Sequence, residues 1–370
     1  MRSNNVLGFI FAATLDDKIP ELASSRTTAS VPIGGKYRII DFDLSNMSNS
    51  GISNVGIVAK SNFQSLMDHV GSGSAYDLSK RRSNLSILPP YDGKAFSSFV
   101  ETIYNMHGYI EHCREEYVLI SQGNVITNID YTDVFDFHSK KKADITLIYK
   151  NHAIPQGYDR PITLDVDNDG KVNQIFVKPG VVDKEVFNHA YGSILIKKDL
   201  LMSEIRNAIS VNQLDVRRLI QSSLGKYSIY AYENKGYCAA ISSINDYFEF
   251  NMDLMKKEVR DELFNPQRPI YTKVRDDAPS RYGLTSNVKN SIIAQGCVIN
   301  GDVENCVISK GVYVGEGAKL SNCIVMQDTK IGCNTNLNYV IIDKDVTIKD
   351  GRSLMGYDSY PIYIAKKSVV

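Results

Sequence analysis

Through the first 255 residues, short apolar runs alternate with segments of helical periodicity. The strand-like runs are Val6–Ala12, Asn54–Ala59, Tyr117–Ser121, Ile145–Tyr149, Gly192–Ile196 and Tyr227–Tyr232. Helices are indicated by the three- and four-residue spacing of Phe99, Ile103, Met106 and Ile110, and are also expected over Asp133–Lys141 and Ile244–Met255. Because strands that alternate with helices build doubly wound sheets, we expect residues 1–255 to form one α/β domain.

The pattern changes after residue 255. Residues 256–288 are charged, contain several prolines and show no clear periodicity, so we interpret them as a linker. From residue 289 to residue 370 a motif of Asn followed by aliphatic residues recurs. It begins at Asn290, Asn305, Asn322 and Asn338, at spacings of 15, 17 and 16 residues.

Within this repeat, aliphatic residues lie six positions apart. They are Ile293 and Ile299; Ile308, Val314 and Leu320; Ile331 and Leu337; and Ile342 and Ile348. A hexapeptide rhythm grouped about three to a coil predicts a left-handed parallel β-helix, whose flat faces each contribute one inward aliphatic. The alternative is the edge of a β-sandwich. Such a β-helix is either an acyltransferase platform or a stacking surface, and because no histidine follows His189, we favour stacking.

Composition narrows the classes of partner. Lys and Arg together number 42, as do Asp and Glu, so the net charge is zero and there is no basic footprint for nucleic acid or an anionic membrane. The six cysteines show no metal-ligand spacing and are expected to be reduced thiols of a cytoplasmic protein. No apolar run approaches the ~18–20 residues that span a bilayer.

One long motif carries a resemblance to a known family. The segment Ser30–Asn46, SVPIGGKYRIIDFDLSN, resembles the segment that follows the phosphate-binding loop in ADP-glucose pyrophosphorylases. Further matches are Asn49–Ile52, Gly71–Gly73, Glu116–Leu119, Ile129–Tyr131, Lys178–Pro179 and Asn251–Leu254. The resemblance runs from Val6 into the repeat region. It implies a nucleotidyltransferase (Rossmann-like) domain followed by the β-helix.

The phosphate-binding loop of that family, A-G-G-x-G-T-R-L followed by K-P, has lost its key residues here. Counting back without a gap, the loop falls on Ala12, Ala13, Thr14, Leu15, Asp16, Asp17, Lys18 and Ile19, and the K-P pair on Thr28 and Ala29. Glycines let backbone N–H groups approach phosphates closely, and none remains. Asp16 and Asp17 would place negative charge beside a triphosphate, and Thr28 offers no cation.

The resemblance also locates two metal positions, and neither holds a carboxylate. Where the family has G-D-H, this chain has Gly123-Asn124-Val125, and where it has G-Y-W-x-D, this chain has Ala240. An amide is a weaker ligand for Mg²⁺ than a carboxylate, and alanine is none. Two-carboxylate capture of Mg²⁺ is central to this chemistry. We therefore expect this chain to bind no metal and no cofactor of its own.

The sugar-phosphate side is less altered. Lys178 matches the lysine that contacts the sugar phosphate in the family, and Gly192 and Ser193 partly match a sugar-contacting segment. These three residues form a vestigial sugar-phosphate site or are a solvated remnant of one. The chain has no G-x-S-x-G, H-E-x-x-H or Walker motif that would supply other chemistry.

Together these features resemble the non-catalytic, GlgD-type subunits of the ADP-glucose pyrophosphorylase family. The resemblance implies a cytoplasmic subunit that joins the catalytic subunit in a hetero-oligomer, a heterotetramer in this family, with Mg²⁺ held by the catalytic partner. It implies no nucleic-acid or membrane partner. Two alternatives stay open: an active nucleotidyltransferase with a divergent loop, and a sugar-phosphate sensor built on a dead enzyme.

Overall fold

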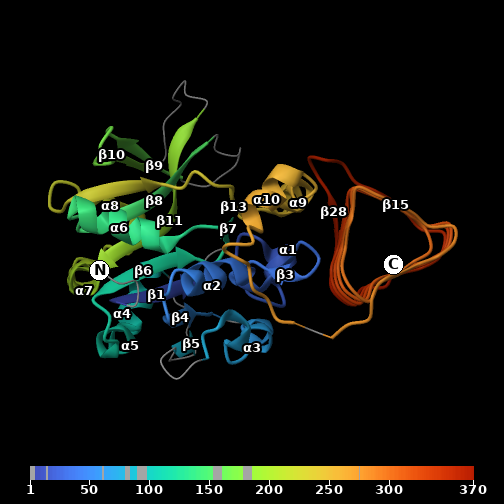
Figure 1. The fold of residues 1–370 in the computed structure, drawn as a ribbon, viewed down its shortest axis with the longest axis horizontal. Coiled ribbons are helices and arrows are strands. Elements are labelled where there is room, and N and C mark those ends of the chain that lie inside the picture. The colour runs from blue at the N-terminus through green and yellow to red at the C-terminus, as the bar shows by residue number, and fades with distance from the viewer. Residues whose placement is uncertain are drawn as a thin grey trace.

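The computed structural model describes residues 5–13, 16–60, 62–79, 84–89, 98–152, 161–177, 186–274 and 276–370. These residues form an α/β domain and a β-helix that pack side by side, with the linking chain running past both (Figure 1). Among the residues so described, no helix is long and apolar enough to cross a membrane.

A nine-stranded mixed sheet forms the centre of the α/β domain. Its strands are β1 (Val6–Phe11), β4 (Asn54–Val58), β5 (Asn84–Leu88), β6 (Tyr117–Gln122), β8 (Ile145–His152), β9 (Ile162–Val166), β10 (Val172–Val177), β11 (Phe187–Lys197) and β12 (Ile229–Glu233). The main path runs β10-β9-β11-β6-β1-β4-β5, and β8 joins β11 to β12. Strand β1 is parallel to β4 and β6, whereas β11 is antiparallel to β6 and β8.

Helices cover both faces of this sheet. They are α1 (Pro20–Ala23), α2 (Ile40–Asn49), α3 (Gln64–Val70), α4 (Phe99–Asn105), α5 (His107–His112), α6 (Tyr131–Lys141), α7 (Lys198–Ser210), α8 (Val216–Ser222), α9 (Ile244–Asp253) and α10 (Lys257–Leu263), with 3₁₀ turns η2 (Thr28–Ser30) and η3 (Ser74–Tyr76). Side-chain N-caps begin several of them: Ser98 accepts from the Glu101 N–H before α4, and Asp130 from the Thr132 N–H before α6.

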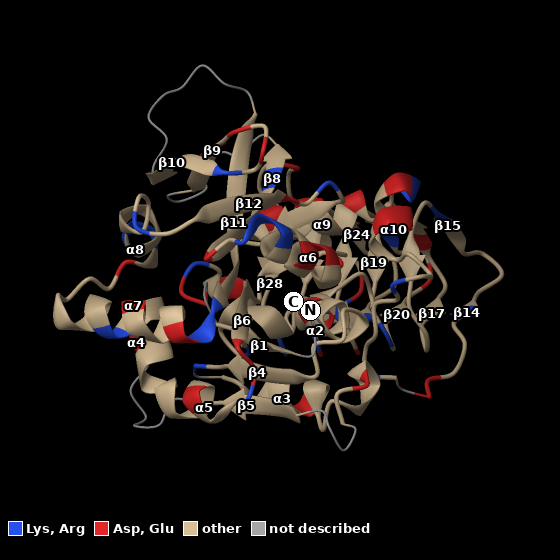
Figure 2. Cartoon of the chain, turned by 60° about the vertical axis from the view of Figure 1, so that its left-hand side comes forward, with Lys and Arg blue, Asp and Glu red and all other residues tan. Residues whose placement is uncertain are grey.

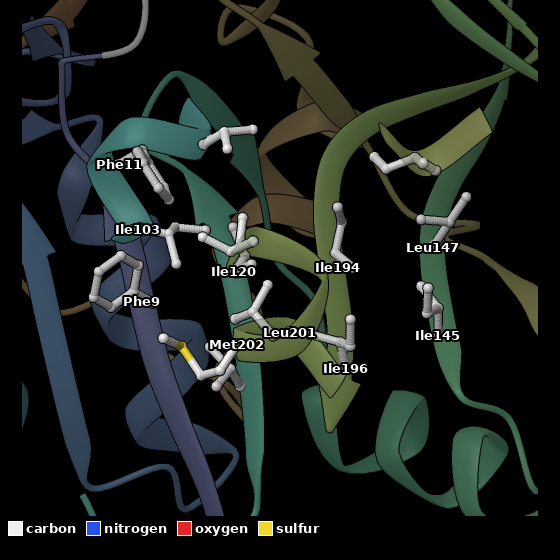
Figure 3. Packing of buried hydrophobic residues seen from close by; sticks show 14 of the residues in the cluster. Phe9, Phe11, Ile103, Ile120, Ile145, Leu147, Ile194, Ile196, Leu201 and Met202 are labelled. Atoms are coloured by element: carbon white, nitrogen blue, oxygen red, sulfur yellow. The ribbon is translucent and has the colours of Figure 1, made fainter. Parts of the chain in front are cut away.

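Alternate residues of β1 point into two different cores. Phe9 packs with Ile103, Ile120 and Leu201 on the side of α4 and α7 (Figure 3), and Ile10 packs in a second cluster on the opposite face. A strand buried on both faces reads as a continuous apolar run. The predicted doubly wound domain is confirmed.

The predicted helix before β6 is broken into two. Met106 ends α4 with φ −92° and ψ 7°, outside the helical range, and α5 starts at the next residue. The apolar spacing nevertheless holds across the break, because Ile103, Met106 and Ile110 are all fully buried. The spacing of apolar residues predicts which side chains are buried, and these side chains stay buried although the helix is interrupted.

The predicted β-helix is also confirmed. Its strands are β14 (Arg281–Tyr282), β15 (Asn287–Lys289), β16 (Ile292–Ile293), β17 (Val298–Ile299), β18 (Asp302–Glu304), β19 (Val307–Ile308), β20 (Tyr313–Val314), β21 (Lys319–Ser321), β22 (Ile324–Val325), β23 (Lys330–Ile331), β24 (Asn336–Asn338), β25 (Val340–Ile342), β26 (Thr347–Ile348), β27 (Ser353–Met355) and β28 (Ile362–Ile364). They stack in three parallel five-stranded sheets, with the repeating aliphatics in one interior cluster.

The fourth repeat begins one residue later than the Asn spacing predicts. In the stack Asn338 aligns with Ser321, so the residue aligned with Asn322 is Tyr339. Asn290, Asn305, Asn322 and Tyr339 all have φ between 40° and 52° at the coil corner. Asn338 instead accepts a hydrogen bond from the Asn322 side chain at 3.1 Å. Asn is the usual non-glycine residue with this left-handed backbone conformation, but in the fourth coil Tyr339 adopts it.

The segment between the domains has structure at both ends. Helix α10 occupies Lys257–Leu263, and the first β-helix strands, β14 and β15, begin at Arg281 and Asn287. Only the stretch between them is irregular.

Candidate functional site

Asp16, in the segment that matches the family's phosphate loop, is bonded to Thr28. Ala12 and Ala13 follow β1 and are buried, whereas Thr14 lies outside the described residues. The Asp16 carboxylate accepts hydrogen bonds from the Thr28 N–H at 2.8 Å and from the Thr28 hydroxyl at 2.7 Å. Burial raises the pKa of Asp16, and the two bonds from Thr28 partly oppose that shift. Asp17, in contrast, is exposed.

This contact joins two positions that the sequence singled out separately. Asp16 stands where the family has a loop residue, and Thr28 stands where it has the phosphate-binding lysine. In this chain the two residues hydrogen-bond to each other. Beside them, a Cβ added to Gly123 would come within 2.9 Å of the Ala29 side chain, so the chain after β6 lies directly against the η2 turn.

The two positions that match the family's metal-binding residues also lie next to each other. Strands β7 (Val125–Thr127) and β13 (Cys238–Ala240) form an antiparallel ribbon that places Ala240 opposite Val125. The Ile241 N–H donates to the Asn124 carbonyl at 2.8 Å, and the Asn124 side-chain amide donates to the Ile241 carbonyl at 3.2 Å. The structure thus brings the two positions together.

These residues do not fit a magnesium ion. Asn124 is 1% exposed, and its side-chain oxygen has no hydrogen-bond partner. The two positions therefore offer a metal ion one neutral oxygen, from Asn124, because alanine has no ligand atom. In the described part of the chain, no group of three or more His, Cys, Asp or Glu side chains could hold a metal ion.

On the sugar-phosphate side, Lys178 lies outside the described residues. Gly192 has φ 85°, and a Cβ there would come within 2.0 Å of the Gln122 amide nitrogen. Gln122 therefore packs directly over Gly192. Ser193 follows in β11 and is 9% exposed.

A cavity of about 200 Å³ opens beside Ala240 and brings together His152 and His189. Pairing of β8 with β11 sets the His152 ring 3.3 Å from His189 and within 2.5 Å of the Tyr191 hydroxyl. Burial lowers the pKa of His189 to about 3, and burial with the nearby Lys150 also lowers the pKa of His152. Both rings are neutral at physiological pH, so neither supplies a cation for a phosphate.

Helix α9 adds acidic groups to the same cavity. Asp246, Glu249 and Asp253 line it from one helix face. Burial and the two aspartates raise the pKa of Glu249. Within the described residues, this cavity is electronegative, which disfavours a dianionic sugar phosphate.

A second pocket, between the two domains, has the opposite character. It holds about 270 Å³ and is lined by five basic side chains: Lys36, Arg38, Lys273, Lys310 and Lys344. Asp68 is the one Asp or Glu among its lining residues. Burial and the neighbouring Arg38 and Arg26 lower the pKa of Lys344 to about 7. Sequence reasoning missed this pocket because its residues come from separate segments of both domains.

A buried ion pair fastens the domains beside this pocket. The Arg26 guanidinium donates to both oxygens of Asp343 at 2.7 and 2.8 Å, and both side chains are 2% exposed. The Tyr363 hydroxyl also donates to Asp343, at 2.7 Å. Around the pair, a shared apolar cluster joins Leu22 and Phe42 of the α/β domain to Ile324 of the β-helix. The two domains therefore form a continuous packed unit.

Comparison with known proteins places this architecture. The nucleotidyl transferase family profile matches residues 17–257, and the profile of the GlmU-like, C-terminal hexapeptide matches residues 273–360. The glycogen biosynthesis protein GlgD of Bacillus subtilis (strain 168) is 32% identical over 370 residues, which cover 99% of this chain and 97% of the relative. The chain belongs to the family of GlgD proteins and glucose-1-phosphate adenylyltransferases.

Other members of the family are about equally similar. GlgD of Geobacillus stearothermophilus is 37% identical over 326 residues, covering 85% of this chain and 83% of that protein. The glucose-1-phosphate adenylyltransferase of Clostridium perfringens (strain 13 / Type A) is 31% identical over 383 residues, covering 99% of this chain and 96% of that protein. Overall similarity alone therefore does not separate the two kinds of protein, and the site residues must.

Proposed function

We propose that this chain is a non-catalytic, regulatory subunit of a glucose-1-phosphate adenylyltransferase in glycogen biosynthesis. The holoenzyme would make ADP-glucose and pyrophosphate from ATP and glucose 1-phosphate. Mg²⁺ would be held by the catalytic subunit, and this chain would bind to that subunit in the cytoplasm and activate it. The observation that carries the proposal is the Asp16–Thr28 contact, in which a carboxylate bonds to the residue that replaces the phosphate-binding lysine.

The metal positions support the same conclusion. Catalysis in this family depends on electrostatic stabilisation of the phosphates, and each lost donor or metal ligand commonly costs a factor of ~10²–10³ in rate. Here the lysine and both carboxylates are absent together, at Thr28, Asn124 and Ala240. These groups act on the same phosphates, so their losses do not simply multiply, but the loss of any one of them already removes most of the rate. Residual synthesis by this chain alone is therefore expected to be negligible.

Activation of a partner requires different contacts with its active and inactive states. A rigid two-domain body is suited to that role, because a contact on one domain is transmitted to the other. The Arg26–Asp343 pair and the apolar cluster around it supply such rigidity. We expect a hetero-oligomer, with two copies of each subunit as the simplest form.

The test is reconstitution with the catalytic subunit encoded by the same organism. The purified chain alone, the catalytic subunit alone and the mixture are assayed for pyrophosphate release from ATP, glucose 1-phosphate and Mg²⁺. We expect no turnover from this chain, co-elution of the two subunits and a higher rate from the mixture. Turnover by this chain alone at ~1 s⁻¹, an ordinary enzyme rate, would instead establish the divergent-enzyme alternative.

The interdomain pocket favours a second candidate, the sensing of a phosphorylated ligand. Five basic groups line about 270 Å³, which suits a multiply charged anion, although one of them, Lys310, also pairs with Asp277 at 3.5 Å. Because the pKa of Lys344 is about 7, anion binding should weaken as pH rises from 6 to 8. Calorimetric titration with a sugar bisphosphate and with inorganic phosphate tests this, with Lys310→Glu as the variant and Lys330→Glu, on the β-helix surface, as the matched control. No binding by the intact chain at pH 6 would exclude the sensor.

A further inference from the structure

A groove on the outer edge of the central sheet lies apart from both of these sites. It has a volume of about 740 Å³, within the range of ligand-binding pockets in general, and shares no lining residue with the cavity beside Ala240. Helix α6 forms one wall, the turn between β9 and β10 forms another, and β12 with the following residues 234–236 forms the floor. None of the site residues singled out by the sequence lines this groove.

Charge in this groove is balanced. Four Lys or Arg side chains and five Asp or Glu side chains line it, and two of them, Lys141 and Asp169, pair with each other across it. Segments of both charges are interspersed around α6 and β12 (Figure 2). The interdomain pocket, in contrast, has five basic groups and one carboxylate. The groove therefore has no net field that would select a phosphate, and suits a neutral ligand with many hydroxyl groups.

Aromatic rings lie on both sides of the strand edge. In the parallel pairing of β12 with β8, Glu233 is in register with Tyr149, and Tyr232 with Ile148. Since successive residues of a strand point to opposite faces, Tyr149 and Tyr232 lie on opposite faces of the sheet, and each packs against a different core. Both are half-buried and line the groove. A ligand that touches both rings must cross the edge.

This arrangement matches the chemistry of a sugar chain. A pyranose presents C–H groups on its faces, which the electron-rich face of an aromatic ring attracts, and hydroxyl groups at its rim. Carboxylate, amide and ammonium groups hydrogen-bond those hydroxyls. Because the two rings lie on opposite faces of the strand edge, a sugar chain that contacts both needs at least two sugar units. It must also bend around the edge.

An extended peptide added to the edge of β12 fits less well. Strand addition needs a run of unpaired backbone groups on the edge. The turn after β9 already covers part of this edge, because the Ala231 N–H donates to the Gly170 carbonyl at 2.8 Å and Lys171 bridges to Tyr230. The strand ends two residues later, at Glu233. Too little free edge remains for a peptide strand.

We propose that this groove binds a neutral, curved α-linked oligosaccharide across the β12 edge, between Tyr149 and Tyr232. The proposal does not depend on partner activation. It assigns the chain a contact with an α-linked glucan, and this contact is separate from any role in making the sugar nucleotide.

The test is calorimetric titration of the full chain with maltoheptaose, with cellohexaose as a straight β-linked control. We expect maltoheptaose to bind and cellohexaose to bind at least tenfold more weakly. Tyr149→Ala and Tyr232→Ala should each weaken maltoheptaose binding about tenfold, and Tyr232→Phe, which keeps the ring, should not. Tyr357→Ala, at an exposed tyrosine of the β-helix, is the matched control.

Thermal unfolding of each variant checks the fold. If Tyr232→Ala unfolds, Asn168→Ala on the exposed β9–β10 turn replaces it, because that side chain lines the groove without packing in a core. Absence of maltoheptaose binding by the folded chain would overturn the proposal. Equal binding of the two sugars, or undiminished binding by folded groove variants, would overturn it as well. Competition by a peptide but not by sugar would point to strand addition instead.

Discussion

At the residue scale, the proposed loss of catalysis depends most on the contact between Asp16 and Thr28. The carboxylate accepts two hydrogen bonds from Thr28 in a partly buried place. We therefore expect that Asn124→Asp and Ala240→Asp together will not restore ADP-glucose synthesis to the isolated chain. Two new carboxylates supply metal ligands, but the phosphates would still meet Asp16, and each like-charge contact costs about 1 kcal/mol even in water.

Pyrophosphate release by the double variant, with and without added Mg²⁺, measures this. Activity should return only when the loop Ala12–Ile19 and the pair Thr28–Ala29 are also rebuilt to the enzyme pattern. Synthesis by the double variant alone at an ordinary enzyme rate would contradict the proposal that the segment around Asp16 cannot bind a triphosphate.

Protonation of Asp43 makes the stability of the fold depend on pH. It is 3% exposed and accepts a hydrogen bond from Ser121, and burial raises its pKa from 3.8 to about 7. Between pH 4 and 7 the folded chain therefore keeps a proton that the unfolded chain releases, so this group's contribution to stability falls as pH rises and is constant above pH 7. A shift of this size is worth a few kcal/mol.

Asp43→Asn mimics the protonated form and should remove that dependence. Urea unfolding at pH 5, 6, 7 and 8 should show the wild type losing stability relative to the variant up to pH 7 and no further. Parallel stability curves for the two proteins would contradict the assignment.

At the scale of elements, the coil corners of the β-helix depend on asparagine. Asn322 has φ 51° and donates from its side chain to Asn338 at 3.1 Å. Asn322→Ala loses both the residue type that tolerates a left-handed backbone, worth roughly 1–2 kcal/mol, and the hydrogen bond. Asn322→Gly keeps the backbone freedom and should cost less. Thermal unfolding ranks the two variants, and equal losses would show that the backbone conformation carries little of the cost.

The sequence predicts an element well when the residues that define it lie close together along the chain. The hexapeptide rhythm predicted the β-helix, because each inward aliphatic stacks on its equivalent in the next coil. It missed the shift at Tyr339, because an aromatic residue took a corner that asparagine usually takes. Motif matching picked out Asn124 and Ala240 one at a time, and the β7–β13 ribbon is what brings them together. It could not find His152 beside His189, since that contact exists only through the pairing of β8 with β11.

At the scale of the whole molecule, one buried ion pair links the domains. Arg26 and Asp343 lie 317 positions apart in sequence, and neither is appreciably exposed. Removing one partner of a buried pair leaves an uncompensated charge and commonly costs ~3–5 kcal/mol, whereas replacing both is often neutral. Arg26→Met should therefore lower the unfolding temperature markedly. Arg26→Met with Asp343→Asn should recover most of it, because the amide oxygen introduced by the second substitution can still accept from Tyr363.

The same two variants separate a structural role of this pair from a role in activation. If the chain acts on its catalytic partner as a rigid body, the single variant should activate less well, because its domains are then held together by the apolar cluster alone. The double variant, once its stability is recovered, should activate almost as well as the wild type. Reconstituted pyrophosphate release, measured below the unfolding temperature of every variant, provides the comparison. A stable double variant that co-elutes with the partner and yet fails to activate it would show that the charge pair itself transmits the signal, and that rigidity alone is not enough.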